Sequence, residues 1–162
     1  MKILSNTLAA GSAGQPRPLL LYLALVAAGL IAFANAVGHP FVHDDLFLIV
    51  EDNDFSLRNI FLYPSIFQKL LPGMKPYYRP LLSLVYTFEF RVFHLQAFFY
   101  HFVNILVHIA NGLLLLTLLR RLTDKDVLSW LVALVFVVHP VQSEAVASVA
   151  GLSNLLFTFF VC

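Results

Sequence analysis

Two adjacent carboxylates, Asp44 and Asp45, are the residues of this sequence best suited to chemistry. They follow a strongly apolar segment within a few residues, and carboxylates so near a membrane are costly unless they are solvated, metal-bound or used. Neighbouring side chains of an extended segment point to opposite faces, so we expect one of the two to enter a site. That carboxylate could take a proton from an acceptor hydroxyl as a general base, or hold a divalent metal on a lipid phosphate. The alternative is a solvated acidic loop.

A second candidate is the pair His139 and Glu144, at the end of another apolar run. An imidazole and a carboxylate at the end of a membrane span indicate a functional site by default. If both face the helix bundle, they lie at the same depth as Asp44, and the three groups would line one cavity. The alternative is a helix end that carries interfacial polar residues.

A third candidate is Arg79, which directly precedes Pro80 at the start of an expected helix. The forked guanidinium of arginine suits a phosphate group. The alternatives are an arginine that pairs with a loop carboxylate, or one whose side chain snorkels toward the membrane interface.

A polar stripe runs along the expected second span, residues 98–119, and at about 100° per residue its members fall on one helix face. Its successive histidines are seven residues apart, or about 10.5 Å along a helix axis, which is too far for two neighbours to chelate one ion. We therefore predict no metal site here and expect hydrogen bonds between helices, with a proton relay or catalytic role as the alternative. The stripe consists of His94, His101, Asn104, His108 and Asn111.

The composition indicates an integral membrane protein. Hydrophobic residues make up 60% of the chain and charged residues 12%, against about 45–50% and about 25% in soluble domains. The net charge of +1 and the scattered basic residues argue against nucleic-acid binding. Cys162 is the single cysteine, so no disulfide forms within the chain. It ends an apolar run shorter than the about 20 residues that a span needs, and we expect an N-terminal fragment of a longer protein.

The apolar segments predict an all-α integral membrane fold with a large helical first outer loop. The run that starts at Val127 covers only twelve residues before His139, so we expect a kink or a break at Pro140. A cytoplasmic tail is expected at residues 1–18, spans at 19–37, 98–119 and 127–147, the start of a fourth near 152, and the outer loop at 38–97.

The positive-inside rule sets the expected orientation, because basic residues gather at the inner ends of the first two spans. Lys2 and Arg17 precede the first span, and Arg120, Arg121 and Lys125 follow the second. The loop between these spans is then outside.

Two further predictions concern the first span and the helices of the outer loop. The first span is expected to be a retained anchor, with a signal peptide cleaved after Ala34-Asn35-Ala36 as the alternative. Within the outer loop we expect a short helix at residues 55–61 and a helix that starts at Pro80 and lies in the membrane interface, with Glu89 and Arg91 among its apolar residues.

Four sequence blocks, in this order, resemble motifs of the membrane domain of the transmembrane and tetratricopeptide-repeat-containing O-mannosyltransferase family. They are residues 41–45, 78–81, 99–108 and 139–151. The resemblance implies the N-terminal part of a GT-C type helical bundle. It also implies transfer of a sugar, such as mannose, from a polyprenyl-phosphate donor to a protein or glycan acceptor on the outer face. It assigns the family's acidic motif to Asp44 and Asp45 and its second polar motif to His139 and Glu144.

On this interpretation the protein is a multi-pass enzyme of a bacterial inner membrane or the endoplasmic reticulum membrane, and the fragment alone is inactive. Arg79 would lie near the donor phosphate, and a divalent metal is an open expectation. The alternative function is a transporter or lipid-handling membrane protein, in which the polar stripe and Glu144 line a pathway.

Overall fold

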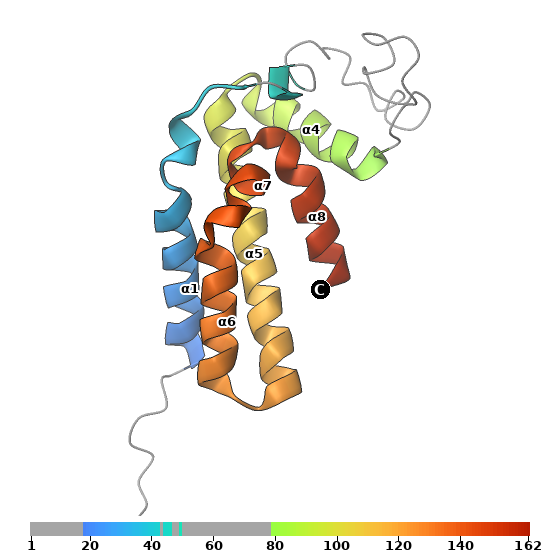
Figure 1. The fold of residues 1–162 in the computed structure, drawn as a ribbon. Helices are drawn as coiled ribbons and strands as arrows, with labels where there is room; N and C mark the ends of the chain where they lie inside the picture. The colour runs from blue at the N-terminus through green and yellow to red at the C-terminus, as the bar shows by residue number, and fades with distance from the viewer. Residues whose placement is uncertain (1–17, 43, 47–48, 50–78) are drawn as a thin grey trace, which may run out of the picture.

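The computed structural model describes residues 18–42, 44–46, 49 and 79–162, and every regular element in these residues is helical (Figure 1). The predicted all-α class is therefore confirmed for this part of the chain, whereas the helix predicted at residues 55–61 lies outside it. The elements are α1 (Pro18–Phe33), η1 (Ala36–Gly38), α4 (Pro80–Phe93), α5 (Ala97–Thr123), α6 (Asp126–Val138), η3 (Pro140–Gln142), α7 (Ser143–Ala147), η4 (Val149–Gly151) and α8 (Leu152–Val161).

Helix α5 is the element around which the others pack, since α1, α6 and α8 all contact it (Figure 1). A short turn joins α5 to α6 in a hairpin, and Asp124 occupies the left-handed region there with φ 51°. Aspartate tolerates this conformation better than most residues. Arg120 then donates from Nε to Oδ1 of Asp126 at 2.8 Å, which closes the turn.

Two glycines allow α1, α5 and α6 to approach closely. A Cβ atom at Gly29 of α1 would lie 2.6 Å from Ile109 Cγ1 and 3.0 Å from Val137 Cγ1. A Cβ atom at Gly112 of α5 would clash with Val137 Cγ2. The fully buried Val137 side chain of α6 thus fills the space that both glycines leave. Small residues such as glycine commonly allow this close approach where membrane helices cross.

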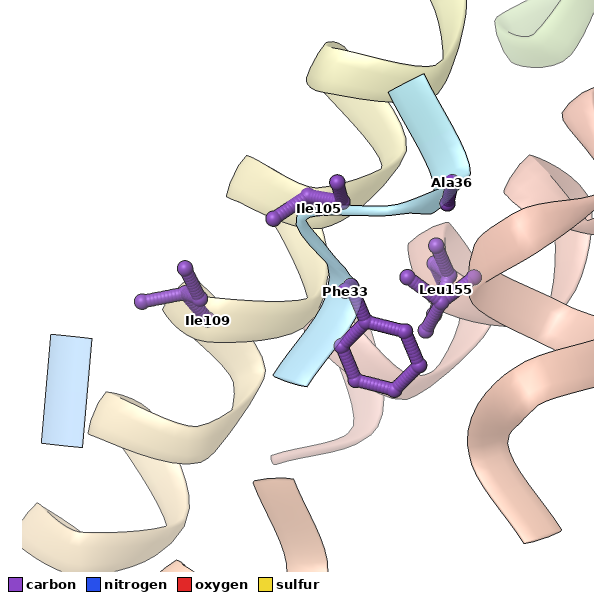
Figure 2. Close-up of a cluster of buried hydrophobic side chains, with 6 residues drawn as sticks. Phe33, Ala36, Ile105, Ile109 and Leu155 are labelled. Atoms are coloured by element: carbon purple, nitrogen blue, oxygen red, sulfur yellow. The ribbon is translucent and has the colours of Figure 1, made fainter. Parts of the chain in front are cut away.

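A second contact region joins α1 and α5 to α8 near the end of α1. Figure 2 shows Phe33, Ile105, Ile109 and Leu155 gathered in one cluster with Ala36 of η1. Helix α1 is also tied to α6, where Trp130 Nε1 donates to the Leu21 carbonyl at 3.0 Å. Helix α1 therefore contributes to this core, and the choice between a retained anchor and a cleaved signal peptide stays a prediction.

The lengths of the helices bear on the predicted spans. Among the described residues, α5 is the one helix long and apolar enough to cross a membrane, and α6 with η3 and α7 reaches that length only as a pair bent by 46°. Of the two outcomes expected at Pro140, the chain takes the break. Residues 19–33 and 149–161 form shorter apolar helices, so the four crossings themselves stay predictions.

The glycine packing gives a first testable prediction. Gly112→Ala should lower the free energy of unfolding by about 1–3 kcal/mol, because the added methyl group overpacks the site against Val137. The cost should shrink when the same change is made in a Val137→Ala background, as measured by thermal unfolding of the four proteins in detergent. Gly38→Ala is the control, since a Cβ there meets no atom within 4 Å. Equal losses for Gly112→Ala in both backgrounds would contradict the assignment.

Candidate functional site

The α7–α8 break, residues 146–151, is the point at which side chains from several elements meet. The backbone leaves α-helical geometry here, so some of its carbonyl groups have no partner within a helix. Asn104 Nδ2 of α5 donates to the Ser148 carbonyl at 2.6 Å and to the Val146 carbonyl at 3.5 Å. The Tyr86 hydroxyl of α4 donates to the Val149 carbonyl at 2.9 Å. Two helices thus donate hydrogen bonds to carbonyls of a third segment.

Asp45 binds the same break from the segment that follows α1. Its side chain is fully buried, and Oδ1 accepts from the Ala150 amide at 2.8 Å and from the Ser148 hydroxyl at 3.3 Å. Its other oxygen, Oδ2, accepts from the Val42 amide at 3.4 Å. Because both carboxylate oxygens are engaged, Asp45 joins the segment after α1 to the α7–α8 break.

Six buried polar side chains lie at the break or interact with a residue that does, and we call them the outer cluster after the predicted outer face. The carboxyl groups of Asp45 and Glu89 both interact electrostatically with Tyr86, and Asp45 also interacts electrostatically with His101. Burial, followed by those two carboxylates, raises the pKa of Tyr86 well above its usual value, which keeps the phenol neutral and able to donate. The outer cluster consists of Asp45, Tyr86, Glu89, Tyr100, His101 and Asn104.

The two adjacent aspartates have different surroundings, as expected, but for a different reason. Asp44 and Asp45 lie in a helical turn, so the expectation of an extended segment is wrong. Successive helical residues are rotated by about 100°, which here leaves Asp44 exposed and Asp45 buried. Arg79 is exposed at the N-cap of α4 and acts electrostatically on Tyr86, next to the outer cluster.

His139 and Glu144 are both exposed and lie apart from the aspartates in the hydrogen-bond network. His139 Nδ1 accepts from the Val141 amide at 3.1 Å and so caps η3. Glu144 lies in the first turn of α7. No hydrogen bond or ion pair among the described residues joins either side chain to Asp44 or Asp45, so the structure does not bring the three groups of the predicted cavity into direct contact.

The polar stripe of α5 faces inward, and the predicted interhelical hydrogen bonds are confirmed for three of its members. Beside Asn104, His108 Nε2 pairs with the Val137 carbonyl at 2.9 Å, and Asn111 Nδ2 donates to the Leu155 carbonyl at 2.9 Å. His101 is fully buried in the outer cluster. No group of three or more His, Cys, Asp or Glu in the described residues could hold a metal ion.

His94 does not belong to the stripe. It lies at the C-cap of α4, before α5 begins, with φ 52° and an exposed side chain. Its carbonyl accepts from the Tyr100 hydroxyl at 2.8 Å, so its backbone, rather than its imidazole, contacts the outer cluster.

Glu89 is the buried residue of this region that was not among the site residues predicted from the sequence. The helix at Pro80–Phe93 forms as predicted. Within it Glu89 is only 1% exposed, and among the described residues neither carboxylate oxygen has a hydrogen-bond partner. Burial raises the pKa of Glu89 to about 8. The available signal was its spacing: Leu82, Tyr86 and Glu89 recur four and three residues apart, which puts them on one helix face.

The comparisons with known proteins first define a class, since the relatives found are glycosyltransferases named protein O-mannosyl-transferase. TMTC1 of Mus musculus is 30% identical over 139 residues, which covers 82% of this chain and 15% of that protein. TMTC3 of Mus musculus is 30% identical over 152 residues, with coverage of 86% and 15%. A Caenorhabditis elegans protein O-mannosyl-transferase is 27% identical over 157 residues, with coverage of 91% and 22%.

The resemblance to the transmembrane and tetratricopeptide-repeat-containing O-mannosyltransferase family is thereby confirmed over most of the chain. The chain spans between 15% and 22% of the length of these three relatives. No family model matches the sequence. No solved structure matches it.

The α7–α8 break gives a second prediction. Asn104→Leu should lower the free energy of unfolding by about 1–3 kcal/mol, because the Ser148 carbonyl loses its 2.6 Å donor while it stays part-buried. Asn154→Leu on α8 is the matched control, since that side chain is exposed. Thermal unfolding in detergent should separate the two variants, and equal midpoints would show that Asn104 does not hold the break.

Proposed function

We propose that this chain is part of a membrane-embedded glycosyltransferase domain of the GT-C type. The domain would move a hexose such as mannose from a polyprenyl-phosphate donor to a protein or glycan acceptor on the outer face of the membrane. The observation that carries the proposal is the similarity, over most of the chain, to proteins named protein O-mannosyl-transferase.

The outward faces of the helices support membrane embedding. Large apolar side chains are exposed along the bundle, including Ile31 at 77%, Val135 at 57% and Phe157 at 71%. Exposed apolar surface on this scale needs a nonpolar environment, and lipid provides it. The basic residues Arg120 and Arg121 at the end of α5 would face the cytoplasm, and the outer cluster would then lie at the other face.

The proposed site takes its chemistry from the donor. Its lipid tail lies in the bilayer and its phosphate at the interface, so the site needs a carboxylate just outside the membrane and a cation nearby. Asp44 has the exposure that a proton acceptor requires, and Asp45 is engaged in anchoring its segment. Arg79 supplies the cation, and His139 and Glu144 are the candidates for further lining of the cavity.

The proposed step is a displacement at the anomeric carbon of the donor. The acceptor hydroxyl oxygen forms the new bond to that carbon while the bond from the carbon to the phosphate oxygen breaks. The lipid phosphate leaves with the electron pair, and Arg79 stabilises its charge. Asp44 takes the proton of the acceptor hydroxyl.

The proposal makes a third prediction. Asp44→Asn in the intact protein should reduce kcat by about 100-fold or more, because the amide cannot accept the proton. The exposure of Asp44 means that the thermal unfolding midpoint should stay within the error of the measurement.

The matched control is Asp124→Asn, which makes the same chemical change at the α5–α6 turn, where asparagine also tolerates the left-handed backbone. This control should keep wild-type transfer, measured with a radiolabelled lipid-linked mannose. Wild-type turnover in the Asp44→Asn variant would show that Asp44 is not the general base.

A further inference from the structure

The buried carboxyl group of Glu89 has no role in the proposed transfer step. It is 1% exposed, and among the described residues neither Oε1 nor Oε2 has a hydrogen-bond partner. An ionised carboxylate in such a position loses its hydration without compensation, which is strongly unfavourable. The docked position of α4 therefore favours a neutral Glu89.

The polar groups that face Glu89 do not compensate a negative charge there. From α5, the Tyr100 hydroxyl donates to the His94 carbonyl, and from α4 itself the Tyr86 hydroxyl donates to the Val149 carbonyl. Among the described residues, Asp45 acts electrostatically on Tyr86, and both Asp45 and His39 act on His101 of α5. Both phenols are thus engaged with backbone carbonyls, and Asp45 adds a further negative charge.

The basic residues of α4 are also badly placed to pair with Glu89. Arg79 is ten residues earlier, or about 15 Å along the helix axis. Arg91 is exposed and lies two residues later, about 200° around the helix. Helix α8, the other helix packed against α4, has no titratable side chain between Leu152 and Val161.

The same helix face that buries Glu89 also docks α4. Leu82 and Tyr86 pack with Tyr100, Val149 and Leu152 in one apolar cluster. Ionisation of Glu89 would favour positions of α4 in which the carboxylate reaches water, and such positions would separate this cluster. The N-terminal end of α4 carries Arg79, so any movement of α4 also moves the proposed phosphate ligand.

We propose that Glu89 is a positioning residue whose neutral form holds α4 against α5 and α8 and thereby sets Arg79 at the donor phosphate. The functional half of this inference rests on the proposed function. Because the docked pKa is raised above the ordinary value, docking is strongest below about pH 4.5, weakens as the pH rises, and is weakest above about pH 8.

The docking claim is tested by distances between spin labels in the intact protein, in a background without other cysteines. The labels are placed at Leu84 of α4 and at Val141 of η3, which are 43% and 71% exposed. We expect one narrow distance at about pH 5.5 and an added, broader population at about pH 8.5. Glu89→Gln, which cannot ionise, should keep the narrow distance at both pH values. Glu144→Gln is the matched control and should respond to pH as the wild type does.

Two results would overturn the docking claim: a wild-type distribution that does not change with pH, or a Glu89→Gln distribution that broadens as the wild type does. The positioning claim is tested by transfer kinetics. KM for the lipid-linked donor should rise several-fold between the two pH values in the wild type and stay constant in Glu89→Gln. A pH response of the distances without this change in KM would refute positioning of Arg79. Absence of transfer under all conditions would refute the proposed function, and the distances would still decide the docking.

Discussion

The backbone carbonyl groups of the α7–α8 break impose the constraint on which the outer end of this structure depends. A helix break within an apolar bundle leaves carbonyls that water does not reach, and each must find a donor inside the protein. Here the donors are side chains from distant parts of the sequence, Asn104 of α5 and Tyr86 of α4. The break also requires glycine at position 151, because a Cβ atom on Gly151 would clash with the Ala145 carbonyl oxygen.

The same constraint explains why a carboxylate from the segment after α1 is held at this point. Asp45 accepts hydrogen bonds from the Ala150 amide and the Ser148 hydroxyl. It therefore pairs with hydrogen-bond donors of the break, whereas Asn104 and Tyr86 pair with its carbonyl acceptors. The segment after α1, helix α4 and the break are therefore fixed relative to one another. The exposure of Asp44 follows from this arrangement, because Asp45 is anchored in the break while the side chain of Asp44 stays accessible. The pair consists of one anchored carboxylate and one accessible carboxylate rather than two equivalent ones.

Several features of the fold follow from local sequence rules. Pro80 starts α4, His139-Pro140 ends α6, and the polar side chains of α5 fall on one face. Each depends on residues close together in the chain, and local chemistry determines them. The sequence also predicts the hydrogen bonds between helices that the side chains of Asn104, His108 and Asn111 make.

The site could be predicted only in part, because its contacts join elements far apart in the sequence. The pattern of α4 shows which residues share a face with Glu89, but not that α5 and α8 cover that face. Likewise, the choice between Asp44 and Asp45 depends on the position of the Ala150 amide, 105 residues from Asp45. His139 and Glu144 are grouped with the aspartates by depth, and because depth does not fix direction around a bundle, their place in one cavity stays a prediction.

The account as a whole depends on the use of a lipid-linked sugar at this end of the bundle. The most direct measurement is transfer of labelled mannose to an acceptor by the purified intact protein in lipid nanodiscs, with polyprenyl-phosphate mannose and a nucleotide-linked mannose compared as donors. The account predicts product from the lipid-linked donor alone. Transfer from the nucleotide-linked donor, or none from either when the protein is folded, would contradict it.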